Sequence, residues 1–216
     1  MAQGGSPRER YREQIRAEIK THAWDQVAGG AAALSLNGIA KEMGISGPAL
    51  YRYFRNRDEL ITELVLDAYR DLAGTCRAAA DPALSPEKRL SEVAGAMRRW
   101  ALGAPHRYLL IFGTPVPGYV APPEATTIAS SLMAVLLDAF AELADGPGVR
   151  TPLETDLVTH GQWAGEHAAT PVALRRVLTL WTRLHGVVSL ELAGHFTGMG
   201  FDPGLLYAAE VEAAIC

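Results

Sequence analysis

The residues of this chain that are best suited to chemistry lie in one short stretch. Tyr51, Arg52 and Tyr53 follow one another, and the small residues Gly47 and Ala49 precede them. A guanidinium can donate two hydrogen bonds to the acceptors of a guanine, and tyrosine hydroxyls commonly bond phosphate oxygens. Small residues let a backbone approach another surface closely. The chemistry that this combination indicates is contact with double-stranded DNA.

Two short helices must position these side chains. The first begins at Ser35, whose hydroxyl can cap it, and ends at Gly44, which tolerates a positive φ at little cost. The second follows almost at once, with Ser46 or Gly47 as its cap and Pro48 in its first turn, where the missing N–H would have no partner anyway. Two short helices around a turn that contains glycine predict a helix-turn-helix.

The same stretch resembles a known family. Residues 49–54, Ala-Leu-Tyr-Arg-Tyr-Phe, followed by Arg-Asp-Glu-Leu at 57–60, resemble the DNA-binding domain of TetR-family transcriptional regulators. The resemblance covers roughly residues 8–70. It implies an all-helical homodimer with an N-terminal helix-turn-helix domain and a C-terminal domain that binds a small ligand and dimerises. Arg57 stands where the family commonly has Lys, and Arg55 where Pro is frequent, so both departures keep or add positive charge.

The residues expected to contact DNA lie on the second helix and beside it: Lys41, Gly47, Pro48, Ala49, Tyr51, Arg52, Tyr53 and Arg57. Arg52 is expected to read a base. For Lys41, a phosphate contact and a solvated surface position are equally good interpretations. Arg57 could help the amides of the following helix N-terminus to hold a phosphate. Arg8 and Arg12 on the first helix also fit either a solvated face or phosphate contact, and the resemblance favours the latter.

The net charge of −4 argues at first sight against a nucleic-acid partner. Its distribution removes the objection, because residues 1–70 hold ten Lys or Arg and nine Asp or Glu, a balance of +1, and the acidity lies in residues 71–216. A balance of +1 is small. Binding would therefore depend on a locally placed basic patch and on a second copy that doubles the contacts.

The predicted fold class is all-α, because helical periodicity recurs along the chain and no segment alternates convincingly with period two. An N-terminal three-helix domain with the helix-turn-helix is expected over residues 1–60. A fourth helix of about residues 56–78, opened by a capping box at Asn56, links it to a C-terminal helical bundle. This bundle, residues 61–216, is expected to bind the effector and to dimerise.

Three helix starts in the bundle repeat a capping side chain followed by proline, at Thr151, Thr170 and Asp202. Helical spacing predicts an inner stripe on the first helix of the chain, formed by Tyr11, Ile15, Ile19, Ala23 and Val27. A narrower stripe is predicted after Thr170, formed by Leu174, Leu178, Trp181, His185, Val188, Leu192 and His195. The resemblance implies that this helix and the last one, from Leu205 to Ile215, form the dimer interface.

The C-terminal half shows a second, shorter resemblance. Residues 181–186, Trp-Thr-Arg-Leu-His-Gly, look like an actinobacterial-type subset of TetR-like C-terminal domains that is named for its Trp-His-Gly motif. Aromatic and histidine residues of this half could line an effector pocket, since ligand sites are mainly apolar with a few polar groups. The candidates are Tyr108, Phe112, Tyr119, His160, Trp163, Trp181 and His185. Each of them taken singly also fits an ordinary core position.

Motifs for other chemistry are missing. The chain has no Gly-x-x-x-x-Gly-Lys loop, no Gly-x-Ser-x-Gly elbow and no His-Glu-x-x-His, so no enzymatic activity and no cofactor are predicted. His160 and His167 are seven residues apart and no spacing typical of a metal site occurs, so no metal is predicted. Cys76 and Cys216 are expected to be free thiols. With no apolar run of about 18 residues, we expect a cytoplasmic protein without membrane contact.

These observations predict a ligand-responsive, DNA-binding transcriptional regulator. It would be a homodimeric repressor that a lipophilic small molecule releases from a near-palindromic operator. The alternative is a helical small-molecule carrier or enzyme that keeps the fold without binding an operator. Binding to DNA upstream of its own gene separates the two.

Overall fold

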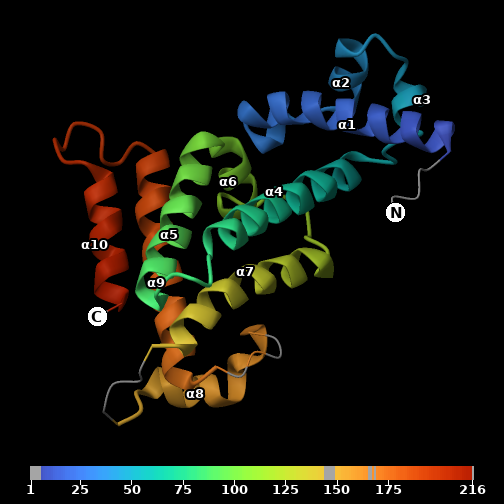
Figure 1. Ribbon diagram of the computed structural model, residues 1–216. Helices are drawn as coiled ribbons and strands as arrows, with labels where there is room; N and C mark the ends of the chain where they lie inside the picture. The colour runs from blue at the N-terminus through green and yellow to red at the C-terminus, as the bar shows by residue number, and fades with distance from the viewer. Residues whose placement is uncertain (1–5, 144–148, 165–166, 168, 216) are drawn as a thin grey trace. The chain divides into compact units, whose positions relative to one another are not determined.

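The computed structural model describes residues 6–143, 149–164, 167 and 169–215, and in this part of the chain it contains helices and no strand (Figure 1). The all-α prediction is confirmed. The elements are α1 Pro7–Ala28, η1 Ala31–Ala33, α2 Leu36–Glu42, α3 Gly47–Leu50, α4 Arg57–Ala79, α5 Pro86–Gly103, α6 Pro105–Phe112, α7 Pro123–Ala141, α8 Pro152–His160, η2 Gly161–Ala164, α9 Pro171–Leu192 and α10 Pro203–Ile215.

Several helices start where a hydroxyl side chain precedes a proline. The side chains of Ser6, Ser85, Thr151 and Thr170 each accept a hydrogen bond from the backbone N–H three residues on, and a proline follows each of them directly. The cap satisfies one of the four orphan amides of the first turn, and proline has no amide to leave unpaired. The helix starts predicted at Thr151 and Thr170 are confirmed, and α10 begins directly after Asp202.

The chain divides into two compact units. The first unit holds Met1–Ala68 together with Pro105–Pro122, and the second holds Tyr69–Ala104 together with Pro123–Cys216. Helix α4 contributes residues to both units, and α6 belongs to the first although it follows α5 along the chain. The compact units therefore do not correspond to a single cut at residue 60.

In the first unit α1 packs against α2, η1 and α6, and α2 packs against α3 (Figure 1). Its core includes the fully buried residues Ile19, Ile39, Leu50, Phe54, Leu60 and Leu64. The predicted inner stripe of α1 is correct at Ile19, Ala23 and Val27 but wrong at Tyr11, which is 61% exposed. The described residues before Ile15 are all exposed, so the first two turns of α1 lie beyond the part that the unit's other elements cover.

In the second unit α9 is the central helix, because it packs against α5, α7, α8 and α10. Its buried residues are Ala173, Leu174, Val177, Leu180, Leu184, Val187 and Val188. The stripe predicted for α9 is therefore partly wrong: Leu178, Trp181, His185 and Leu192 are half-buried, and His195 is exposed beyond the end of the helix. A helix with four neighbours buries a wide face rather than a narrow seam.

Helix α7 has the length and apolar composition of a membrane span, alone among the helices of the described ranges. Threonine and serine interrupt its apolar run, which is why the sequence did not predict it. Composition alone is weak ground for a span, since the core helix of a bundle has the same character. Within its unit α7 packs against α5 and α9.

Candidate nucleic-acid interface

Local hydrogen bonds set the geometry of the predicted helix-turn-helix. The hydroxyl of Ser35 accepts from the amide of Gly38 at 3.2 Å and caps α2, and the hydroxyl of Ser46 accepts from the amide of Ala49 at 3.3 Å and caps α3. Ser46 rather than Gly47 is thus the cap. Between the helices Gly44 has φ +67°, a left-handed conformation that disfavours any side chain. The turn predicted from these residues is confirmed.

Helix α3 is short and ends at Leu50. After Leu50 the chain continues as a tight turn, in which the amide of Tyr53 donates to the carbonyl of Leu50 at 2.8 Å. Bonds of this i to i−3 type belong to 3₁₀ geometry, which is common where a short helix ends. We call residues 47–53 the recognition segment. In it Tyr51 and Arg52 are exposed and Tyr53 is half-buried, so neither tyrosine belongs to the core.

A concave surface brings the start of α1 and the recognition segment together. Its volume is about 430 Å³, and its lining comprises Arg8, Tyr11, Arg12, Ala49, Arg52 and Tyr53. We call it the basic cleft, because three arginines and no carboxylate line it. Tyr11 was missed as a site residue, since the helical period alone places it on the inner stripe. In the structure it lies at the open cleft and is 61% exposed, and no local sequence signal reports that position.

The cations of the first unit fall into two groups. Arg8, Arg12, Lys41 and Arg52 take part in no ion pair or side-chain hydrogen bond among the described residues. All four are exposed. Cations that no carboxylate neutralises are available to phosphate oxygens, which dominate the affinity of proteins for DNA. This group contains the cations that we expect at the DNA surface.

Other cations near the recognition segment are engaged within the protein. Arg57 donates to the carbonyls of Ala31 at 2.7 Å and Leu34 at 3.1 Å, so two of its donor groups hold η1 against the start of α4. Arg55 pairs with Glu59, whose carboxylate also accepts from the Arg55 amide at 2.7 Å. The side chain of Asn56 caps α4 at 2.8 Å, so half of the predicted capping box is present. The phosphate contact of Arg57 stays a prediction.

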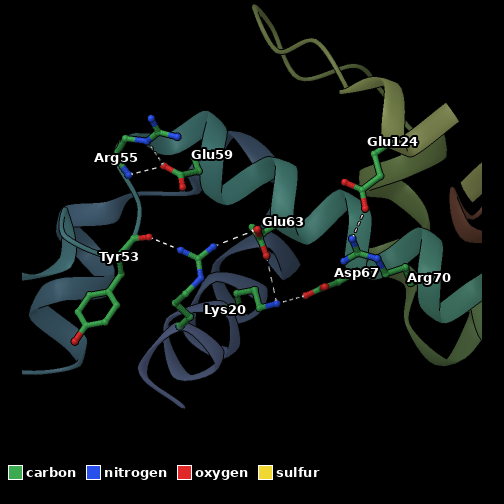
Figure 2. Close-up of polar contacts among 9 residues, drawn as sticks. Lys20, Tyr53, Arg55, Glu59, Glu63, Asp67, Arg70 and Glu124 are labelled. Atoms are coloured by element: carbon green, nitrogen blue, oxygen red, sulfur yellow. Dashed lines mark hydrogen bonds and ion pairs between the residues drawn. The ribbon is translucent and has the colours of Figure 1, made fainter. Parts of the chain in front are cut away.

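A row of charged side chains fastens the recognition segment to α4 (Figure 2). Arg16 of α1 donates to the carbonyl of Tyr53, and its second terminal nitrogen lies 3.1 Å from the carboxylate of Glu63. Lys20, one turn further along α1, lies 3.7 Å from Glu63 and 2.6 Å from Asp67. These side chains are only 23% to 33% exposed. Such partly buried pairs are screened less than surface pairs, and they fix the position of α1 relative to the first turns of α4.

The seven residues predicted for the effector are divided between the units. Tyr108, Phe112 and Tyr119 belong to the first, and Tyr108 and Phe112 lie with their ring centroids 5.2 Å apart. Tyr108 is buried, and the Tyr119 hydroxyl lies 3.2 Å from the hydroxyl of Thr62. These contacts suit packing as well as a ligand site. Their role toward an effector stays a prediction.

The other four candidates belong to the second unit. Trp181 and His185 meet edge to face at 4.1 Å, whereas the exposed imidazole of His160 faces Asp156 at 3.1 Å. Trp163 is half-buried in η2. Burial lowers the pKa of His185 to about 4, which keeps its imidazole neutral at physiological pH.

Two further predictions concern reactive and metal-binding groups. Burial raises the pKa of the Cys76 thiol to about 12, so the reactive thiolate is scarce, and Cys216 lies outside the described residues. Over the described ranges, no three His, Cys, Asp or Glu side chains are grouped so that they could hold a metal ion.

Two family models match the chain. The model of bacterial regulatory proteins of the tetR family matches residues 27–64, and the model of the Tetracyclin repressor-like C-terminal domain matches residues 90–214. The first match includes the recognition segment, and the second includes most of the second unit. The Trp-His-Gly subset stays a prediction, because neither description names it.

Individual relatives agree with these matches. The chain is 36% identical to the HTH-type transcriptional regulators Rv1816 of Mycobacterium tuberculosis and Mb1846 of Mycobacterium bovis, across 94% of this chain and 92% of each relative. The crystal structure of SCO4313, described as a regulatory protein, is 58% identical with a TM-score of 0.87, across 97% of this chain and 99% of that one. PfmR of Thermus thermophilus, a TetR-family regulator, shares the fold at 14% identity and a TM-score of 0.60, across 92% of this chain and 96% of its own.

Proposed function

Since the chain belongs to the TetR family and is a DNA-binding transcriptional regulator, we propose that it represses transcription as a homodimer that a small lipophilic effector releases from its operator. Two copies of the basic cleft would then meet successive major grooves about 34 Å apart on a near-palindromic site. A cytoplasmic location follows from this proposal, and no catalytic step is part of it.

The observation that carries the proposal is the basic cleft itself. Arg8 and Arg12 line it from α1, and Arg52 lines it from the recognition segment. We assign Arg8 and Arg12 to phosphates and Arg52 to a base edge, because phosphate contacts fix orientation and a guanidinium can pair with both acceptors of guanine. Tyr11 and Tyr53 also line the cleft and supply hydroxyls. Tyr51 and Lys41 do not line it, but both are exposed, and we assign them further contacts with the DNA backbone.

Helix α4 is the element through which an effector would act. Its start is fastened to α1 by Glu63 and Asp67, and its later part pairs with the start of α7 through Arg70 and Glu124 at 2.5 Å (Figure 2). A ligand that favours another tilt of α4 would displace the recognition segments from the operator spacing. A coupling free energy of about 1 to 3 kcal/mol is enough for a fivefold to hundredfold loss of affinity.

Footprinting and gel shift with DNA from upstream of the protein's own gene test the proposal. We expect a protected site with two related halves, and we expect Arg52→Ala and Tyr53→Phe to weaken binding. Arg55→Ala is the matched control, because Arg55 is an exposed cation next to the recognition segment that does not line the basic cleft. A purified protein that stays monomeric and leaves these duplexes unbound at low salt would contradict the proposal.

A further inference from the structure

The first unit contains a cavity away from the basic cleft. It has a volume of about 310 Å³ and lies between the end of α1 and η1 on one side and α6 on the other. Val27, Ala28 and Ala31 form the first wall, and His106, Leu109 and Leu110 are prominent in the second. None of the seven residues predicted for the effector lines it. All of its lining residues belong to the first unit, the unit that carries the recognition segment.

The lining is apolar except for a few groups, of which the imidazole of His106 is the most distinctive. His106 meets Trp24 edge to face at 5.5 Å, and it has no hydrogen-bond partner among the described residues. Burial and the neighbouring charge of Arg107 lower the pKa of His106, so its ring is neutral at physiological pH. A neutral imidazole offers one N–H donor and one nitrogen acceptor.

The shape and chemistry of the cavity restrict its occupant. Leu109 is 47% exposed although it lines a concave surface, so apolar area is available for a ligand to cover. A charged ligand would lose hydration without meeting an opposite charge, because no Lys, Arg, Asp or Glu lines the cavity. A neutral hydroxyl can instead bond to the imidazole while its carbon skeleton fills the apolar part.

The cavity also borders the connection into the helix-turn-helix. Ala31 lines it, and the carbonyl of Ala31 accepts a hydrogen bond from Arg57 at the start of α4. Leu34, whose carbonyl also accepts from Arg57, directly precedes the residue that caps α2. An occupant that presses on Ala31 therefore acts on the segment that fixes α2 against α4.

We propose that this cavity is a ligand site in the DNA-binding unit, that it takes a compact neutral alcohol or phenol whose hydroxyl bonds to His106, and that its occupation changes the affinity for DNA. The last part rests on the proposed function. Linkage makes the effect reciprocal: DNA must change the affinity for the ligand by the same factor as the ligand changes the affinity for DNA.

Binding of p-cresol and toluene to the full chain tests the site. Methyl NMR of the wild type should show both probes shifting the signals of Val27, Leu109 and Leu110. We expect p-cresol to bind roughly threefold to tenfold more tightly, which is the net contribution of one hydrogen bond. His106→Leu should remove that difference while retaining toluene binding. Equal affinities of the two probes for the wild type would overturn the role of His106.

A substitution that fills the cavity provides the second test. Ala28→Phe places a ring in the cavity from an exposed position, and we expect it to weaken p-cresol binding at least tenfold. Ala17→Phe is the matched control, since Ala17 is exposed on the same helix and does not line the cavity. If Ala28→Phe binds p-cresol as the wild type does, or if the three methyl signals do not shift, the site is rejected.

DNA binding is measured with and without p-cresol in the same series. We expect p-cresol to change the affinity of the wild type, and to leave that of Ala28→Phe unchanged. A wild-type protein that binds p-cresol and DNA independently would overturn the regulatory part of the proposal. The DNA titration without p-cresol tests the proposed function by itself. A failure to bind DNA is therefore distinguishable from a failure of p-cresol to change DNA binding.

Discussion

The guanidinium of Arg16 donates a hydrogen bond to the backbone carbonyl of Tyr53, at the end of the recognition segment. The same side chain lies 3.1 Å from Glu63 of α4 and stacks over the ring of the buried Phe54, with its Cζ 4.1 Å from the ring centroid. One residue of α1 thus holds the recognition segment against α4. It does so without lining the basic cleft.

Arg16→Gln should therefore weaken DNA binding by displacing the recognition segment, without removing a contact with DNA. We expect operator affinity to fall roughly tenfold, or about 1.4 kcal/mol, because the end of the recognition segment loses its anchor. The slope of log affinity against log salt concentration should stay at the wild-type value, since no phosphate contact is removed. Fluorescence anisotropy at several salt concentrations measures both quantities. Glu63→Gln should act in the same direction, and the double variant should lose less than the sum. A reduced salt slope would instead make Arg16 a phosphate contact.

Arg12→Ala should reduce both the affinity for DNA and its dependence on salt concentration. Arg12 lines the basic cleft and has no ion-pair partner in the described part of the chain. Each phosphate contact that is lost should reduce the salt slope by about 0.9. The decrease in affinity should be similar for operator and unrelated DNA, because a phosphate contact carries no sequence information. Arg55→Ala, measured in parallel, should leave the slope unchanged. An unchanged slope for Arg12→Ala would place Arg12 on a solvated face.

Arg57→Lys tests whether Arg57 is structural. Its guanidinium reaches the carbonyls of Ala31 and Leu34 at once, a fork geometry that a lysine ammonium does not reproduce. We expect the free energy of unfolding in urea to fall by about 1 to 3 kcal/mol although the charge is kept. Lys41→Ala removes an exposed cation of the same unit and should leave stability nearly unchanged. A fully stable Arg57→Lys protein would show that the two hydrogen bonds matter little.

The imidazole of His185, whose Nε2 is buried, should make stability depend on pH. Burial lowers its pKa from 6.5 to about 4, so between these values the unfolded chain binds a proton that the folded chain excludes. The contribution of the neutral imidazole to the free energy of unfolding is fully present above pH 6.5. It is lost as the pH falls toward 4, by a total on the order of 3 kcal/mol. Urea denaturation from pH 7.5 to 4.5 should show this slope in the wild type and a smaller one in His185→Phe. His195→Gln, at an exposed histidine, should retain the wild-type slope.

Local signals were sufficient for much of the molecule. Ser35, Gly44 and Ser46 fix the helix-turn-helix through caps and one positive φ, and each acts within a few residues of itself. The family resemblance, carried mainly by residues 49–60, agrees with the comparisons. Fold class and the location of the recognition segment were therefore predictable from residues close together in the chain.

What could not be predicted depends on long-range packing. Tyr11 has the period of a core residue, and only the tertiary structure shows that no helix of its unit covers it. Arg57 looks like any cation at a helix start, and its engagement depends on carbonyls of Ala31 and Leu34. The placement of α6 beside α1 depends on contacts such as that between Trp24 and His106. These contacts join positions that no local pattern relates.

The membership of α6 in the first unit has a consequence for synthesis in the cell. Residues 105–122 complete a unit whose other part ends at Ala68, and the Thr62 and Tyr119 hydroxyls, 3.2 Å apart, join the two parts. A nascent chain that has emerged only as far as α4 lacks that closing segment. The DNA-binding unit is therefore completed only after the ribosome has made residues 69–104, which belong to the second unit, so it cannot finish folding before that part of its neighbour has been synthesised.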